Sequence, residues 1–227
     1  NHYHLYSPKA PNSNAEQYLT QPPFVPHYPS GLLDRLLPSL WRSVMLGSQL
    51  ATDGVQLYHG LSGELPFDIL ESKVRSVVTI HDLIFLDYPE LYPAIDRKIY
   101  RTKSSMACER ANRIIAISEQ TKQSIIKHFG IRESKIDVVY QSCNPIYLNA
   151  PTPAQQATIK NRYQLPDQYL LYVGSITERK QTLQLVEAFK LLNNRGFKLV
   201  LVGNGAEYLD KMQQYVKANQ LIDRVLF

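Results

Sequence analysis

Short apolar runs alternate along this chain with longer stretches in which apolar residues recur every three or four positions. The runs have the length and β-branched character of buried strands, and the periodic stretches have the spacing of one helix face. In the first part of the chain they predict helices over about 38–51 and 94–111, and a helix that Ser118 caps and Gly130 ends. The strands predicted there lie at 55–58, 74–80, 113–117 and 136–140.

The same alternation returns after a proline-containing run of small polar residues at 149–155. It predicts a strand at 169–173 that is buried on both faces, then a helix with Val186 and Phe189 on its apolar side. A strand at 198–202, a helix around Met212 and the start of a strand at 225–227 follow. We therefore expect one domain at 1–148, a linker at 149–165 and a second domain at 166–227.

The first 29 residues differ from this pattern, because they are polar, aromatic and rich in proline. One short strand is predicted at 3–6. The prolines at positions 22, 23, 26 and 29 predict an otherwise irregular surface loop, since proline cannot donate a backbone hydrogen bond.

Strands that alternate with helices indicate an α/β protein with parallel sheets and right-handed crossovers. Functional groups in such sheets gather at the carboxyl ends of the strands. His59, His81, Ser118 and Gln141 all lie just past a predicted strand, and we expect them to share one rim. Taken singly, each could equally be a polar residue that caps the end of its own strand.

The turn after the strand at 169–173 is a candidate phosphate site. It begins at Gly174, where the absence of a Cβ allows a tight turn and the close approach of a ligand. Arg179 and Lys180 then precede a helix, whose N-terminus already favours an anion. The alternative is a solvated loop with ordinary surface cations.

Composition adds a preference for anionic partners. The 227 residues carry a formal net charge of +5, which favours nucleotide phosphates or a lipid headgroup surface, but no basic run is dense enough for a nucleic-acid groove. Cys108 and Cys143 match no metal or disulfide framework, which favours a reducing compartment. No apolar run approaches the ~20 residues of a spanning helix.

Five motifs in order resemble the family-4, or group 1, glycosyltransferases, and the resemblance runs from about residue 31 to the end. The segment at 58–66 fits bacterial members of that family. The motifs are the sequences at 78–90 (VTIHDLIFLDYPE), 111–119 (ANRIIAISE), 135–140 (KIDVVY), 172–180 (YVGSITERK) and 199–205 (LVLVGNG).

The resemblance implies a GT-B fold, with two Rossmann-like domains that face a cleft. It implies that the first domain holds the acceptor and the second a nucleotide-sugar donor. Carried over by position, His81 lies near the transferred sugar, Gly174 approaches the donor, and Arg179 and Lys180 neutralise the diphosphate. Further candidates for the rim of the cleft are His59, Ser118, Gln141 and Gly203.

The implied reaction moves a hexose from a GDP- or UDP-sugar to a saccharide or lipid-linked acceptor in cell-surface polysaccharide synthesis. The transfer is expected to be retaining and to need no cofactor or metal. The expected place is the cytoplasm, with peripheral contact at the inner face of the plasma membrane.

Two departures from the family pattern matter. Ser175 stands where some members have an arginine, and the family's paired glutamates and its first strand with a glycine loop are absent. We therefore expect a fragment that is inactive alone. In it the strands at 198–202 and 225–227 would lack their neighbours, and the second domain would be the less stable one.

Other activities remain open at this point. A nucleotide-sugar epimerase on the same scaffold would use the donor without an acceptor, and a non-catalytic module would bind an acceptor or a membrane without turnover. A Rossmann dehydrogenase is disfavoured, because the sequence after Gly174 lacks the later glycines of Gly-x-Gly-x-x-Gly.

Overall fold

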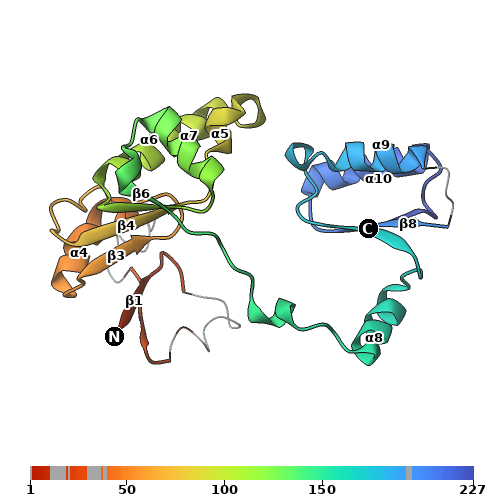
Figure 1. The fold of residues 1–227 in the computed structure, drawn as a ribbon, viewed down its shortest axis with the longest axis horizontal. Helices are drawn as coiled ribbons and strands as arrows, with labels where there is room; N and C mark the ends of the chain where they lie inside the picture. Colours follow the sequence, from red (N-terminus) through yellow and green to blue (C-terminus); the bar gives the residue numbers. More distant parts are fainter. Residues whose placement is uncertain (1, 11–18, 20, 30–36, 38–39, 193–195) are drawn as a thin grey trace. The chain divides into compact units, whose positions relative to one another are not determined.

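The computed structural model describes residues 2–10, 19, 21–29, 37, 40–192 and 196–227. The chain divides into two compact units, Asn1–Ser142 (unit 1) and Cys143–Phe227 (unit 2). Unit 1 has two parallel sheets and unit 2 has one, and each unit has its own buried core (Figure 1).

A four-stranded parallel sheet with the order β3-β4-β5-β6 forms the centre of unit 1. The parallel pairing confirms the predicted α/β class. All four strands overlap their predicted ranges, although β3 lies two residues further along the chain than expected. Their bounds are β3 Leu57–Gly60, β4 Arg75–Ile80, β5 Arg113–Ala116 and β6 Ile136–Val138.

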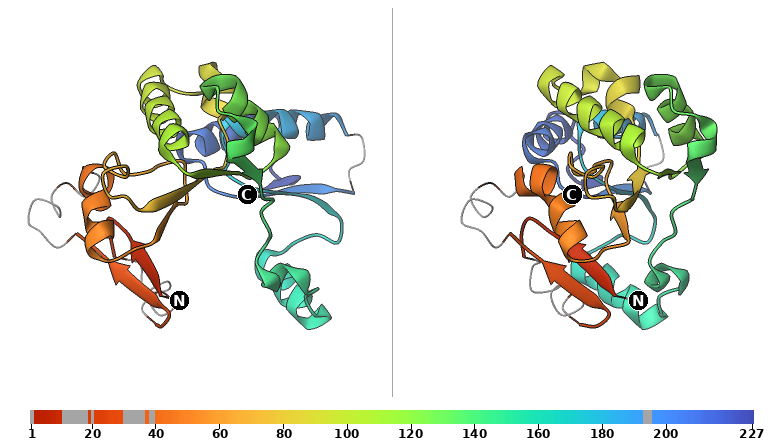
Figure 2. Two further views of the ribbon diagram at one scale, coloured as in Figure 1. Left: turned by 60° about the vertical axis from the view of Figure 1, so that its left-hand side comes forward. Right: turned by 90° about the vertical axis from the view of Figure 1, so that its left-hand side faces the viewer.

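Three helices lie on one face of this sheet, as Figures 1 and 2 show: α5 Ile84–Asp87, α6 Ala94–Arg110 and α7 Glu119–Phe129. Right-handed crossovers between adjacent parallel strands place α6 and α7 on the same side. The predicted cap and stop of α7 are confirmed, since the Ser118 side chain accepts from the Thr121 N–H and Gly130 is left-handed, with φ of 65°. Two 3-10 turns, η2 Pro89–Leu91 and η3 Glu133–Lys135, precede α6 and β6.

The core of unit 1 forms between the sheet and its helices. Val78 and Ile114 from the sheet are fully buried, as are Ala107 from α6 and Ile125 from α7. In the described part of the helix predicted over 38–51, a π-helical turn, η1 Trp41–Met45, leads into α4 Leu46–Thr52. Positions 38 and 39 lie outside the described residues.

A separate two-stranded parallel sheet pairs β1 Tyr3–Tyr6 with β2 Phe24–His27. The strand predicted at 3–6 is confirmed, but the expectation that the prolines exclude regular structure is wrong, because β2 contains Pro26. Pro26 pairs opposite Leu5. Each strand of a two-stranded sheet is an edge strand, so a residue without an N–H is tolerated on its open side.

Unit 2 holds a three-stranded parallel sheet with the order β7-β8-β9. Helices α9 Thr182–Leu191 and α10 Ala206–Ala218 lie together on one face of it (Figure 1). The strands β7 Tyr169–Val173, β8 Lys198–Val202 and β9 Val225–Leu226 lie where the sequence predicts them. The predicted linker is not wholly irregular, since it contains helix α8 Pro153–Tyr163, which Thr152 begins with a capping box. A short 3-10 turn, η4 Pro145–Leu148, precedes it.

Two expectations about this sheet are wrong for the same reason, which is strand order. β7 is an edge strand and not buried on both faces, because Leu171 and Val173 are 56% and 69% exposed. β8 does not lack neighbours, because it lies between β7 and β9, and Leu199 and Leu201 are 1% and 2% exposed. Within the described ranges, none of the helices combines the length and hydrophobicity needed to cross a lipid bilayer.

Candidate functional site

His81 follows β4 directly and is exposed at the end of that strand. Its Nε2 lies 2.8 Å from the carbonyl oxygen of Leu61, and its Nδ1 lies 3.4 Å from the side-chain nitrogen of Gln141. A carbonyl oxygen only accepts and an amide nitrogen only donates, so in the neutral ring Nε2 carries the proton and Nδ1 accepts. These neighbours therefore select one tautomer of His81.

The backbone of His81 is tied to the start of α7 through Thr121, which is buried. Thr121 Oγ1 donates to the His81 carbonyl oxygen over 3.1 Å and lies 3.0 Å from Ser118 Oγ. Because the Thr121 hydroxyl proton goes to the carbonyl, Ser118 is the donor in the second bond. Ser118 thus both caps α7 and, through Thr121, braces the loop that carries His81. Sequence reasoning missed Thr121. The pattern that could have indicated it is a hydroxyl residue in the first turn of a helix that a serine caps.

Gln141 comes three residues after β6, which ends at Val138, and it contacts His81. The ends of β4, β5 and β6 therefore bring together His81, Ser118 and Gln141. His59 does not join them. It lies inside β3, opposite Val77, because that strand extends further than predicted.

One nitrogen of the His59 ring is bonded within the sheet, and the residue as a whole is exposed. Its Nε2 lies 2.8 Å from Thr79 Oγ1, on β4. Partial burial lowers the pKa of His59, which favours the neutral ring. This bond agrees with the alternative of a polar residue that caps its own strand, and His59 makes no hydrogen bond with His81.

Glu64 holds the loop that supplies the Leu61 carbonyl. Its carboxylate accepts from Arg42 Nη2 at 2.7 Å and from Lys103 Nζ at 3.1 Å, so it links η1 to α6. The next loop residue toward Leu61, Gly63, donates its N–H to the Thr79 carbonyl oxygen at 2.9 Å. Glu64 was noted in the sequence only as part of a motif, and its partners come from segments far apart in the chain.

In unit 2, Gly174 and Gly203 follow the adjacent strands β7 and β8, and their loops pack backbone against backbone. The Gly174 N–H donates to the Val202 carbonyl oxygen at 2.9 Å, and the Ile176 N–H donates to the Asn204 carbonyl oxygen at 2.9 Å. A Cβ on Gly203 would lie 1.8 Å from the carbonyl oxygen of Gly174, so only glycine fits there. Gly174 has φ of +157°, which also favours glycine.

Arg179 and Lys180 lie on the 3-10 turn η5 Glu178–Lys180, just before α9, and both are exposed. Neither side chain makes an ion pair or hydrogen bond with another described residue. Helix α9 begins at Thr182 without a side-chain cap, which leaves the N–H groups of its first turn available. Thr177, in the same loop, has a buried hydroxyl with no hydrogen-bond partner among the described residues. An anion placed at this loop would therefore meet two cations and the N–H groups of an uncapped helix start.

Within the described part of the chain, one group of side chains could hold a metal ion: His4, His27 and Asp53, whose ligand atoms lie within 4.8 Å of one another. They are joined directly, with 2.9 Å between His4 Nδ1 and His27 Nε2 and 3.5 Å between His27 Nδ1 and Asp53 Oδ2. Tyr6 donates to Asp53 Oδ2 at 2.7 Å, and burial together with this bond raises the Tyr6 pKa. Burial lowers the pKa of His27. The group ties the β1–β2 sheet to the end of α4.

Two α/β units in succession, each with a parallel sheet and with glycines or polar side chains at its strand ends, define the Rossmann-like GT-B class of fold. Residues 1–145 match Glycosyltransferase Family 4, and residues 155–227 match Glycosyl transferases group 1. The chain belongs to this glycosyltransferase family. The match begins at residue 1, whereas the motif resemblance begins near residue 31.

Curated relatives include the O-antigen chain mannosyltransferase B of Escherichia coli, 31% identical over 60% of this chain and 35% of the relative. The O-antigen chain mannosyltransferase RfbU of Salmonella typhimurium is 25% identical over 67% of this chain and 39% of the relative. The aligned part of the chain thus spans well under half of the length of these relatives.

Solved structures with the same fold include Alr3699/HepE of Anabaena in complex with UDP and glucose. It has a TM-score of 0.67 and 15% identity, over 100% of this chain and 69% of that one. A glycosyltransferase from Rickettsia africae has a TM-score of 0.65 and 19% identity, over 100% of this chain and 68% of that one. At these identities the likeness concerns the fold.

Proposed function

We propose that the protein transfers a hexose from a nucleotide-diphosphate sugar to a saccharide or lipid-linked acceptor in the synthesis of a cell-surface polysaccharide. The observation that carries the proposal is the turn of unit 2, where Gly174, Arg179 and Lys180 meet the uncapped start of α9. The O-antigen mannosyltransferases among the relatives support the reaction class, and the UDP in the Anabaena structure supports a nucleotide sugar. A GDP- or a UDP-sugar fits this chemistry equally.

In this proposal the two cations act on the leaving group. As the bond between the sugar and the β-phosphate breaks, its electron pair remains on the phosphate oxygen, and negative charge grows there. Fixed cations and helix N–H groups at that oxygen stabilise the transition state more than the ground state, which is what accelerates a reaction. With Ser175 in the place of an arginine, this role falls to Arg179 and Lys180.

His81 is proposed to contact the transferred sugar from the strand ends of unit 1. In its selected tautomer the Nε2 proton is held by Leu61, so His81 acts through hydrogen bonding and orientation and not as a preformed general base on that nitrogen. Gln141 and Ser118 are proposed to border the site of unit 1, and Gly203 is proposed to border the donor site of unit 2. We further propose a retaining transfer that uses no cofactor or metal, in the cytoplasm with peripheral contact at an anionic membrane surface.

Calorimetric titration of the chain with GDP and with UDP tests the donor site. Arg179→Ala and Lys180→Ala are each expected to weaken diphosphate binding by about 10-fold or more, because each removes a charge-assisted hydrogen bond. Lys217→Ala, which removes an equal charge from the exposed end of α10, serves as the matched control and should bind as the wild type does. Saturable binding that neither turn variant weakens would contradict the proposal.

A further inference from the structure

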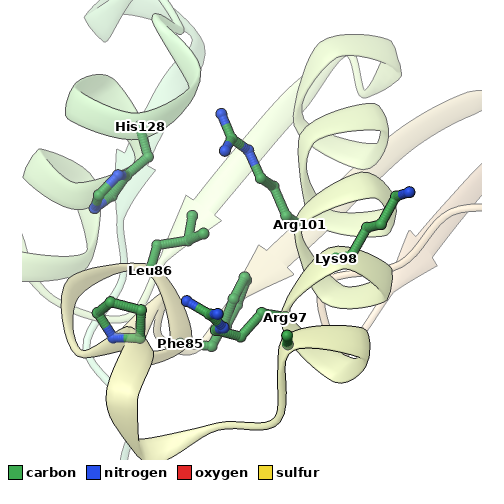
Figure 3. A pocket seen from close by; sticks show the side chains of 8 residues that line it. Phe85, Leu86, Arg97, Lys98, Arg101 and His128 are labelled. Atoms are coloured by element: carbon green, nitrogen blue, oxygen red, sulfur yellow. The ribbon is translucent and has the colours of Figure 1, made fainter.

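An open cavity of about 410 Å³ lies on the helical layer of unit 1, between α5, η2, α6 and the end of α7 (Figure 3). One part of its lining is apolar and comes from Phe85, Leu86 and Pro89. The other part is basic and comes from Arg97, Lys98, Arg101 and His128. None of the strand-end residues discussed above lines it, and its lining contains no carboxylate.

The three α6 cations that line the cavity, Arg97, Lys98 and Arg101, have no carboxylate partner among the described residues. Arg97 and Arg101 are four residues apart, so they lie on the same face of the helix, and like charges at this spacing repel each other. Figure 3 shows both guanidinium groups on the cavity side of α6, whereas Lys98 extends the other way. None of the three makes an ion pair with a described residue.

The side chain of Arg97 adds a second, independent observation. Its Nε is buried and has no hydrogen-bond partner within the described structure. A buried N–H without a partner costs free energy, and proteins rarely leave one unpaired. At the wall of the cavity, Arg97 is therefore repelled by the charge of Arg101, and its own Nε–H lacks an acceptor among the described residues.

Asp87, the carboxylate bonded to the cavity residue His128, is engaged by partners other than the two arginines. Asp87 accepts from His128 Nε2 at 2.7 Å, from Ser124 Oγ at 2.9 Å and from Lys127 Nζ at 3.3 Å. These hydrogen bonds lower the pKa of Asp87, the bond from His128 most of all, and so keep the carboxylate ionised. All three donors belong to α7, so the carboxylate is directed toward that helix. The α6 side of the cavity thus remains cationic.

We propose that this cavity binds a phosphate-bearing ligand, with Arg97 and Arg101 holding the phosphate and Phe85, Leu86 and Pro89 contacting an apolar part next to it. Two guanidinium groups one helical turn apart present several N–H donors to phosphate oxygens, which is a geometry that arginine favours. The volume falls within the ~300–1,000 Å³ typical of small-molecule sites and exceeds what one inorganic ion needs. The phosphate can belong to a soluble phosphate ester or to a lipid headgroup, and the proposal does not depend on glycosyl transfer.

The test uses the chain with Arg179→Ala and Lys180→Ala already introduced, so that the turn of unit 2 does not bind the probe. Inorganic pyrophosphate is titrated by calorimetry in one arm. Vesicles of phosphatidylcholine with and without phosphatidylglycerol are used in a sedimentation assay in the other. We expect saturable binding in at least one arm, weakened by about 10-fold or more in Arg97→Gln and in Arg101→Gln. Binding of pyrophosphate alone identifies a soluble ester, and binding of the anionic vesicles alone identifies a lipid headgroup.

Arg132→Gln is the matched control, since it removes the same charge from an exposed position of unit 1 that does not line the cavity. Arg101→Glu guards against loss of folding: a carboxylate one turn from Arg97 should pair with it, so thermal stability should be kept or raised while binding is lost. The absence of saturable binding in both arms would overturn the proposal. Equal weakening by Arg132→Gln and Arg97→Gln would overturn it too, because it would show unspecific charge attraction.

Discussion

At the scale of single residues, the protonation and position of a candidate site residue in this protein depend on neighbours that are not themselves proposed to contact a substrate. The Leu61 carbonyl decides which nitrogen of His81 is protonated, and Thr121 decides where the backbone of His81 lies. Glu64, bonded to Arg42 and Lys103, in turn holds the loop of Leu61. A histidine after a strand is therefore only a candidate until its partners are known.

In a protein that also carries the family's paired glutamates, we predict that His81→Ala lowers the turnover of sugar transfer by about 10²-fold, the usual cost of losing one stabilising contact in a transition state. The affinity for GDP or UDP should change little, because the nucleotide is proposed to bind unit 2. Transfer kinetics together with calorimetric titration of the nucleotide measure both quantities. An equal loss of turnover and nucleotide affinity would remove His81 from its proposed role. Nitrogen NMR of the wild-type ring gives an independent check, since the neutral form should carry its proton on Nε2.

At the scale of the elements, strand order decides how much each strand contributes to stability. The apolar runs of β7 and β8 are alike in the sequence, yet β8 is central and buried while β7 lies at the edge of its sheet. Central position removes apolar area from water on both sides of the strand, and the free energy of burial scales with that area.

Leu201→Ala, in β8, should therefore lower the free energy of unfolding of unit 2 by about 2–5 kcal/mol, because a fully buried leucine leaves a cavity. Leu171→Ala is the matched control in β7. The Leu171 side chain is 56% exposed, so its removal should lower the free energy of unfolding by much less than Leu201→Ala does. Urea unfolding followed by circular dichroism measures the difference. Similar costs for the two variants would mean that β7 is covered in solution.

At the scale of the whole molecule, the described residues form two hydrophobic cores that share no side chain. One core contains Trp41, Val78 and Ile125, and the other contains Phe189, Leu201 and Met212. Since a cooperative unit is built around one core, the two units are expected to unfold separately.

The chain provides a probe for this, because Trp41 is its only tryptophan and is 3% exposed in the core of unit 1. We predict that Trp41 fluorescence reports the unfolding of unit 1 alone, while far-ultraviolet circular dichroism reports both units. Leu201→Ala should then shift one component of the dichroism curve to lower temperature and leave the fluorescence transition in place. A shift of both signals by the same amount would show a single cooperative structure.

Local patterns in the sequence were enough for most elements and for part of the candidate site. The strands β1, β7 and β8, the cap at Ser118 and the stop at Gly130 depend on side chains within a few residues, so the sequence alone determined them. The same holds for Gly174, Gly203, Arg179 and Lys180 in unit 2. Their positions after a strand or before a helix follow from the local sequence and do not depend on the order of the strands in the sheet.

Tertiary structure decided everything that depends on which segments become neighbours. Pro26 fits a strand only because β2 has a single partner, and Nε2 of His59 has a partner only because Thr79 of the adjacent strand faces it. The exposure of β7, the contact of Gln141 with His81 and the uncompensated charges of Arg97 and Arg101 are likewise absent from any local pattern. The physical reason is that propensity and periodicity act over one or two turns of chain, whereas burial, pairing and charge compensation are set by residues tens of positions away.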